Sequence, residues 1–228
     1  RRGGRGRMNL GWLSLEAKYL GRARDFYTDR LGLEVLRESE TECALEAGDT
    51  ELVLRAPSTV PRGGTHVHYA FSTPRDEYTG WKESLDVVEQ RDFGAYSSLY
   101  FYDPDGHCAE IGETDASGEG IVGVFEVVFE VEDLDRSVEF YTSLGAPVSD
   151  RGDGRRRVRL DAGGFDIELW KPQLGIADGQ GGVHMDVGFE VNDIAGAVDT
   201  VEDDALASET TRDGVRLRDP DGHYVTVY

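Results

Sequence analysis

The sequence predicts an α+β protein of four similar units, each a short strand, a helix and three further strands, which pair into two domains with curved, mainly antiparallel sheets. A five-residue turn, Asp-Pro-Asp-Gly-His, occurs at residues 103–107 and again at residues 219–223. A turn that recurs at domain-scale distance indicates duplication. The length of 228 residues exceeds the usual size of one domain, about 100–150 residues, so two domains are expected.

One residue near the start of each unit marks the register of the repeat. The four anchors are Trp12, His68, Glu126 and Asp186, at successive intervals of 56, 58 and 60 residues. Each anchor is followed by apolar residues at helical spacing, which predicts a helix with one buried face. In chain order these stripes are Ala23, Phe26 and Tyr27; Tyr78, Trp81 and Leu85; Leu134, Val138 and Tyr141; and Ile194, Val198 and Val201.

Strands are predicted where strand-favouring residues gather between turn residues, as at residues 50–54, 156–160 and 166–170. Residues 114–120 are small and polar and are expected to be a linker. The predicted domains are therefore 8–113 and 121–228, with two units paired inside each half. Pairing of units between chains is the alternative. Residues 1–7 contain four arginines and are expected to be a disordered basic tail, or to precede the true start at Met8.

The charge of the chain excludes several classes of partner. A net charge of −21 repels nucleic acid and anionic lipid. No apolar run approaches the roughly 18–20 residues of a membrane span, so a cytoplasmic protein is expected. The acid-rich, lysine-poor composition resembles that of proteins from salt-accumulating haloarchaea, with an acidic mesophilic protein as the alternative. Cys43 and Cys108 are expected to be buried free thiols.

Four βαβββ units paired into two domains resemble the vicinal oxygen chelate superfamily, which holds glyoxalases, bleomycin- and fosfomycin-resistance proteins and extradiol dioxygenases. The most specific motif is Tyr100-x2-Asp103-Pro104-x-Gly106-x3-Glu110, which is similar to the extradiol-dioxygenase signature. Residues 64–71, Gly-Thr-His-Val-His-Tyr-Ala-Phe, are similar to the strand that carries that family's metal histidine. The resemblance covers nearly the whole chain after Met8.

The resemblance implies that each domain presents four positions to a cleft, on the first and last strands of its two units. The repeat register assigns Trp12, Val53, His68 and Glu110 to the first cleft, and Glu126, Glu168, Asp186 and Thr226 to the second.

In the first cleft, the resemblance implies that His68 and Glu110 bind a divalent metal, Fe(II) or manganese, zinc or nickel. His66 is a further candidate ligand, because residues two apart on a strand face the same side. The alternative is a buried, hydrogen-bonded histidine–carboxylate pair without a metal.

Three aromatic residues are assigned to the first cleft. Tyr100 stands where the family keeps an active-site tyrosine that hydrogen-bonds the substrate oxygen, which makes it the catalytic candidate; packing within a strand is the alternative. Trp12 stands where ring-cleaving enzymes have a metal histidine. Phe93 stands where they have an acid–base histidine, and phenylalanine cannot transfer a proton. Trp12 and Phe93 are both expected to line the substrate pocket.

In the second-domain cleft, Glu126, Glu168 and Asp186 are expected to converge. Three neighbouring carboxylates raise one another's pKa values unless a cation or water relieves the repulsion. A solvated, degenerate cleft is expected there, with a hard ion such as magnesium or calcium as the alternative.

The resemblance implies a metal-dependent enzyme that acts on a small oxygenated substrate, with a catechol as one such molecule and ring-cleaving dioxygenase as the nearest named activity. Because Trp12 and Phe93 depart from the ring-cleaving pattern, lyase, isomerase and transferase activities stay open. A metal-free binding protein of the bleomycin-resistance type is the main alternative, and a pseudoenzyme with structural domains is the third. A small molecule is the expected partner, and a homodimer is a candidate assembly.

Overall fold

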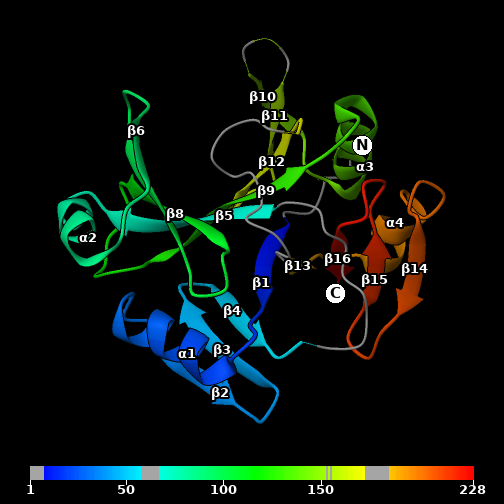
Figure 1. The fold of residues 1–228 in the computed structure, drawn as a ribbon. Coiled ribbons are helices and arrows are strands. Elements are labelled where there is room, and N and C mark those ends of the chain that lie inside the picture. The colour runs from blue at the N-terminus through cyan, green and yellow to red at the C-terminus, as the bar shows by residue number, and fades with distance from the viewer. Residues whose placement is uncertain (1–7, 58–66, 153, 155, 173–184) are drawn as a thin grey trace.

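The computed structural model describes residues 8–57, 67–152, 154, 156–172 and 185–228, and these form the four βαβββ units that the sequence predicts (Figure 1). Residues 1–7, the predicted tail, and His66 lie outside the described residues. Unit one comprises β1 (Asn9–Glu16), α1 (Leu20–Asp29), β2 (Val35–Glu38), β3 (Glu42–Ala47) and β4 (Thr50–Arg55). Unit two comprises β5 (Val67–Pro74), α2 (Tyr78–Ser84), β6 (Glu89–Asp92), β7 (Ser97–Tyr102) and β8 (Cys108–Thr114).

The second half of the chain repeats this order. Unit three comprises β9 (Gly123–Glu130), α3 (Leu134–Leu144), β10 (Val148–Arg151), β11 (Arg157–Asp161) and β12 (Asp166–Trp170). Unit four comprises β13 (Met185–Glu190), α4 (Ile194–Asp199), β14 (Ala207–Thr210), β15 (Val215–Arg218) and β16 (Tyr224–Val227). The α+β class predicted from the sequence is confirmed.

The helices of units three and four begin at aspartate caps. The Asp133 carboxylate accepts hydrogen bonds from the first backbone N–H groups of α3, and the Asp193 carboxylate does the same for α4. The predicted apolar stripes face inward, with Tyr27 on α1 and Tyr141 on α3 fully buried. None of the described helices is long and apolar enough to cross a membrane.

The described strands form two eight-stranded mixed sheets. Their orders are β14-β15-β16-β13-β1-β4-β3-β2 and β10-β11-β12-β9-β5-β8-β7-β6. Within each unit, the first and last strands are parallel neighbours, as β5 is to β8 and β9 is to β12. The other pairings are antiparallel, which confirms the mainly antiparallel sheets expected from the sequence.

Each sheet combines one unit from each half of the chain, so the expected pairing of units within each half is wrong. Strands β1 and β13 join units one and four, and β5 and β9 join units two and three. The first strand of every unit has its own unit on one side only, and its other edge must pair elsewhere. All four first strands offer the same kind of edge, so the sequence pattern alone could not select the partner.

The duplicated Asp-Pro-Asp-Gly-His turn connects the two units of each half. The Asp103 carboxylate accepts backbone N–H groups of its own turn and the Tyr27 hydroxyl of α1, the latter at 2.9 Å. Nε2 of His107 bonds the Glu16 carbonyl at the end of β1, at 2.8 Å. In the second half, Asp219 and His223 make the same contacts with α3 and β9. The turn therefore joins neighbouring units along the chain, while the sheets join units from different halves.

Candidate metal centre

Four of the predicted cleft residues lie together on one face of the second sheet. His68 on β5, Glu110 on β8, Glu126 on β9 and Glu168 on β12 are each less than 5% exposed. One ring nitrogen of His68 and one oxygen each of Glu110 and Glu126 all lie within 4.8 Å of one another. Among the described residues, these three form the one group of histidine, cysteine and acidic side chains that could hold a metal ion.

The imidazole of His68 is oriented by two hydrogen bonds. Nδ1 lies 3.2 Å from the Cys108 carbonyl oxygen, and Nε2 lies 2.9 Å from Oε2 of Glu110. A carbonyl only accepts, so Nδ1 carries the proton and Nε2 is the nitrogen that faces the acidic groups. Burial lowers the pKa of His68, but the bonds to Cys108 and Glu110 outweigh it and raise the pKa to about 10. A metal ion bound there would replace the Nε2 proton.

Glu126 is an acid of this group whose charged form is disfavoured by burial. Burial raises the pKa of its carboxyl well above the ordinary value, and the charges of Glu168 and Glu110 raise it further. Arg159 and His68 act in the opposite direction without cancelling the rise. A buried carboxylate of this kind is relieved by a cation, which is what a metal ion supplies.

Two arginines of β11 hold Glu168. Nε of Arg159 and Nη1 of Arg157 each lie 2.8 Å from Oε1 of Glu168, and Nε1 of Trp170 donates to Oε2 at 2.6 Å. Arg159 also reaches Oε2 of Glu126 with Nη2, at 2.9 Å. Both oxygens of Glu168 are therefore bonded to protein donors, whereas Glu126 keeps an oxygen in the three-ligand group.

Tyr100 contacts two of the candidate ligands. Its ring stacks on that of His68, with centroids 5.5 Å apart, and its hydroxyl lies near enough to Glu110 for the two to interact electrostatically. Burial, followed by the charge of Glu110, raises the pKa of Tyr100, so the phenol stays protonated. The hydroxyl expected to face a substrate oxygen thus lies near a candidate metal ligand.

A cavity of about 290 Å³ lies beside the buried group. Arg159 forms part of its wall, together with Tyr96, Phe125 and Asp166. The Tyr96 side chain lies near enough to Arg159 for the two to interact electrostatically. Phe93, expected to line the pocket, is about half exposed, is not among the residues that line this cavity, and stacks on the wall residue Tyr96, with centroids 4.9 Å apart.

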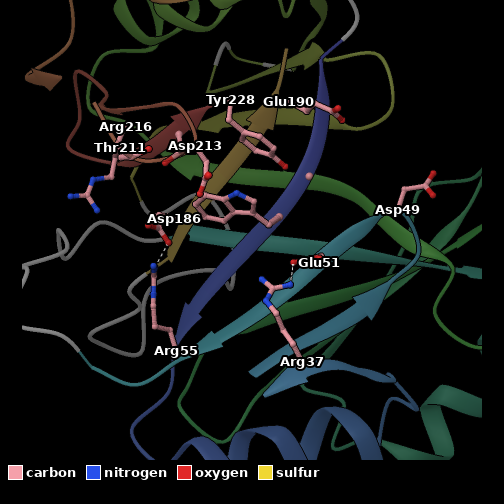
Figure 2. A pocket seen from close by; sticks show the side chains of 13 residues that line it. Arg37, Asp49, Glu51, Arg55, Asp186, Glu190, Thr211, Asp213, Arg216 and Tyr228 are labelled. Atoms are coloured by element: carbon pink, nitrogen blue, oxygen red, sulfur yellow. Dashed lines mark hydrogen bonds and ion pairs between the residues drawn. The ribbon is translucent and has the colours of Figure 1, made fainter. Parts of the chain in front are cut away.

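The expected grouping of cleft residues is wrong, because unit one shares a sheet with unit four and unit two with unit three. Trp12 and Asp186 line a different cleft, between units one and four (Figure 2). Thr226 lines that cleft as well, and Val53 pairs in register with Ser14 on its central strand β1. Trp12 therefore does not wall a pocket at His68, and Asp186 does not converge with Glu126 and Glu168.

Arg157 and Arg159 are the site residues that sequence reasoning missed. They alternate with Val158 along residues 156–160, Arg-Arg-Val-Arg-Leu, and so share one face of β11. Arg159 and Glu168 are direct partners in the register of β11 and β12. Two arginines two residues apart on a strand next to a buried glutamate are the signal that could have revealed this ion-pair network.

Comparison with known proteins yields a family match over both halves. The model of the glyoxalase/bleomycin resistance protein/dioxygenase superfamily matches residues 9–111 and 123–227. Metallothiol transferase FosB of Staphylococcus haemolyticus is 29% identical over 112 residues, which cover 45% of this chain and 81% of FosB. FosB of Staphylococcus epidermidis is 28% identical over 112 residues, with the same coverage.

Two solved structures are similar over almost the whole chain. Glyoxalase I from Zea mays aligns with a TM-score of 0.74 at 18% identity, over 97% of this chain and 92% of that one. A putative dioxygenase from Bacillus subtilis aligns with a TM-score of 0.75 at 17% identity, over 98% of this chain and 86% of that one. At these identities, the likeness shows a shared fold.

Proposed function

Because the chain belongs to the glyoxalase/bleomycin resistance protein/dioxygenase superfamily, we propose that units two and three form the divalent-metal centre of an enzyme acting on a small oxygenated molecule. The observation that supports this proposal most strongly is the convergence of His68, Glu110 and Glu126 within 4.8 Å in a buried group. One imidazole and two carboxylates suit manganese, iron(II), zinc or nickel.

The surroundings of the three ligands fit a metal ion. Nδ1 of His68 is fixed by the Cys108 carbonyl, which leaves Nε2 as the ligand atom, an arrangement common around metal-bound histidines. Tyr100 stacks on His68, and Nε2 of His68 lies 2.9 Å from Glu110. Arg157, Arg159 and Trp170 donate hydrogen bonds to both carboxylate oxygens of Glu168. Three protein ligands would leave coordination positions open for a substrate.

The chemistry follows from charge. A divalent ion bound there would polarise neighbouring substrate oxygens and stabilise the negative charge that develops on them. A doubly charged ion would add positive charge beside the two arginines, which also pair with Asp150 and Asp166, and this added charge favours an anionic substrate. Arg159 reaches from this group to the cavity wall and would bind and orient the anionic end of the substrate, with Tyr96 near the guanidinium.

Ring cleavage receives less support than the sequence suggested. The described ligand group has one histidine, whereas the non-haem iron site of ring-cleaving enzymes uses two histidines and one carboxylate. Phe93 supplies no proton acceptor and stacks on Tyr96. We therefore favour a lyase, isomerase or transferase reaction, and the FosB relatives, named metallothiol transferases, support a metal-dependent transferase.

The test is the metal content of purified protein after chelator treatment and reloading with manganese or zinc, measured by elemental analysis. Wild type is expected to take up one ion per chain. His68→Ala and Glu126→Gln are each expected to weaken uptake by about 10- to 100-fold, whereas Asp186→Asn, in the other cleft, is expected to leave it unchanged. Absence of uptake by wild type, or uptake that survives both substitutions, would overturn the proposal.

A metal-free binding protein is the second candidate, because the buried charges can balance without an ion. Protonated His68, Arg157 and Arg159 match the three glutamates in number. In that case the cavity beside Arg159 would hold an anionic ligand by itself. Ligand binding by chelator-treated protein that is unaffected by added metal would favour this candidate over the first.

A further inference from the structure

The cleft between units one and four is related to the candidate metal centre by the internal repeat. In unit two, Glu110 pairs in register with Tyr100, and in unit four Thr226 pairs in register with Arg216. The other ligand positions are replaced as well: Asp186 stands in place of His68, Trp12 in place of Glu126, and Val53 in place of Glu168. One acid with no histidine beside it is not a metal site, yet a cavity of about 640 Å³ remains.

Two aromatic residues, Trp12 and Tyr228, line this cavity. A Cβ atom built on Gly188 would come within 2.1 Å of Nε1 of Trp12, and one on Gly11 within 1.7 Å of the Tyr228 hydroxyl oxygen. Both rings therefore lie directly on glycine backbone, in space that any other residue would fill. Trp12 and Tyr228 both line the cavity, where Figure 2 labels Tyr228. Such a lining suits a flat ring, which stacks on indole and phenol faces.

Two arginines bring positive charge to the same cavity. Arg55 replaces Trp170 of the metal centre and pairs with the buried Asp186, and its Nε is buried with no hydrogen-bond partner among the described residues. Arg216 replaces Tyr100 and is near enough for its charge to act on Asp186. The acids Asp49, Glu190 and Asp213 are exposed at the rim, where solvent screens them. Arg216 and Arg37 also pair with Glu209 and Glu51, so the buried Nε of Arg55 is the donor that a ligand would meet, and this favours one negative charge on the ligand, not several.

We propose that the cleft between units one and four is a metal-free binding site for a small planar aromatic monoanion, such as an aromatic carboxylate. The ring lies on Trp12 and Tyr228, and the carboxylate approaches Arg55 and Arg216. The cavity volume is in the range typical of small-molecule sites. The site is independent of the metal centre, because none of its residues belongs to the three-ligand group.

The test uses benzoate as the probe and titration calorimetry on the full chain with a chelator present. We expect one benzoate per chain. Benzamide, which keeps the ring and loses the charge, cyclohexanecarboxylate, which keeps the charge and loses the flat ring, and the cation benzamidine are each expected to bind at least about tenfold more weakly, or about 1.4 kcal/mol. No benzoate binding at millimolar concentration, or tighter binding of benzamide or benzamidine, would overturn the proposal.

Substitutions locate the site. Trp12→Leu and Arg216→Gln are each expected to weaken benzoate binding about tenfold. Arg55→Gln is combined with Asp186→Asn, since the single change would leave a buried carboxylate unpaired. Glu126→Gln, in the other cleft, is the matched control and is expected to change binding less than twofold. Thermal unfolding of each variant checks that it folds. Binding that survives Trp12→Leu and Arg216→Gln, or that is lost in Glu126→Gln, would refute this location.

Discussion

At the scale of single residues, the buried acids of the candidate metal centre cost folding stability in the metal-free protein and are suited to bind a cation. Glu110, Glu126 and Glu168 are buried in one face of a sheet, where a carboxylate without a cation costs free energy. Arg157 and Arg159 compensate Glu168, and His68 is hydrogen-bonded to Glu110. Glu126 is left with a single arginine contact and a raised pKa. The free energy that the buried Glu126 carboxylate costs in folding is explained if the group binds a cation, which would neutralise its charge.

Replacement of Glu126 by glutamine is therefore expected to stabilise the metal-free protein. The pKa of Glu126 in the folded state is raised above the ordinary 4.5, so the folded protein binds this proton more tightly than the unfolded chain does. The stability of wild type therefore falls as pH rises above about 4.5. Glutamine keeps a hydrogen-bonding side chain for Arg159 and removes this dependence. Thermal unfolding in chelator from pH 5 to 8 measures it.

The gain of the glutamine variant over wild type should grow with pH and reach a few degrees, at about 2–4 °C per kcal/mol. Glu46→Gln, at an exposed acid of β3, is the control. A constant difference across this pH range would contradict the assignment of Glu126 as an uncompensated buried acid.

Metal affinity is expected to depend on the proton of His68. Because the pKa of His68 is raised to about 10 in the metal-free protein, a metal ion must displace the Nε2 proton at any pH below that value. Apparent affinity should rise by up to about tenfold per pH unit between pH 6 and 9. Calorimetry in buffers of different ionisation enthalpy should detect about one proton released per ion. Affinity that does not vary with pH would show that His68 is not a ligand.

Part of this site could be read from the sequence. His68 and Glu110 follow from the repeat register and the motif, and the structure places them 2.9 Å apart. The third member, Glu126, was assigned to another cleft, because its position depends on which unit pairs with which. Arg159 was missed for the same reason. It matters only because β12 brings Glu168 beside it and β9 brings Glu126 within reach.

At the scale of elements, the repeated turn acts as a clamp between consecutive units. Asp219 is fully buried and accepts the Tyr141 hydroxyl of α3 at 2.8 Å, while His223 bonds the Glu130 carbonyl at the end of β9. The turn in the first half does the same for α1 and β1. The sequence displayed this motif clearly, but its partners are distant in the chain and appear only in the fold.

Removal of one clamp contact is expected to lower stability measurably. Tyr141→Phe deletes the hydroxyl that bonds the buried Asp219 carboxylate and should cost about 1–3 kcal/mol. Tyr19→Phe removes the hydroxyl of a largely exposed side chain and should change the free energy of unfolding by less than about 0.5 kcal/mol. Urea unfolding of both variants makes the comparison. Equal stability of the two would show that the turn does not clamp the units.

At the scale of the whole molecule, the two halves of the chain build two clefts that have diverged. Figure 1 shows α1 and α2 on one side and α3 and α4 on the other, with strands of both halves meeting between them. One cleft keeps a histidine and acids, and the other has Trp12, Arg55 and Arg216 at the related positions. The βαβββ units were predictable from local periodicity. The pairing of units from different halves was not, because the first strands of all four units offer equivalent edges.

Because each sheet needs both halves, a chain divided within residues 115–122 should function only as a pair. Each half alone would expose the edges of two central strands, β1 and β5 or β9 and β13. The co-expressed halves are expected to co-purify as a one-to-one complex that binds metal, and each half alone to aggregate. Soluble, monomeric halves that each fold independently would contradict the exchanged pairing.

The central claim is that His68 and Glu110 from one half and Glu126 from the other hold one metal ion. Anomalous diffraction from crystals of the full chain grown with manganese tests it most directly. The account predicts one strong peak per chain, about 2.0–2.2 Å from Nε2 of His68 and from an oxygen of each glutamate, and none between Trp12 and Asp186. No peak at the three ligands, or a peak in the cleft between units one and four, would contradict it.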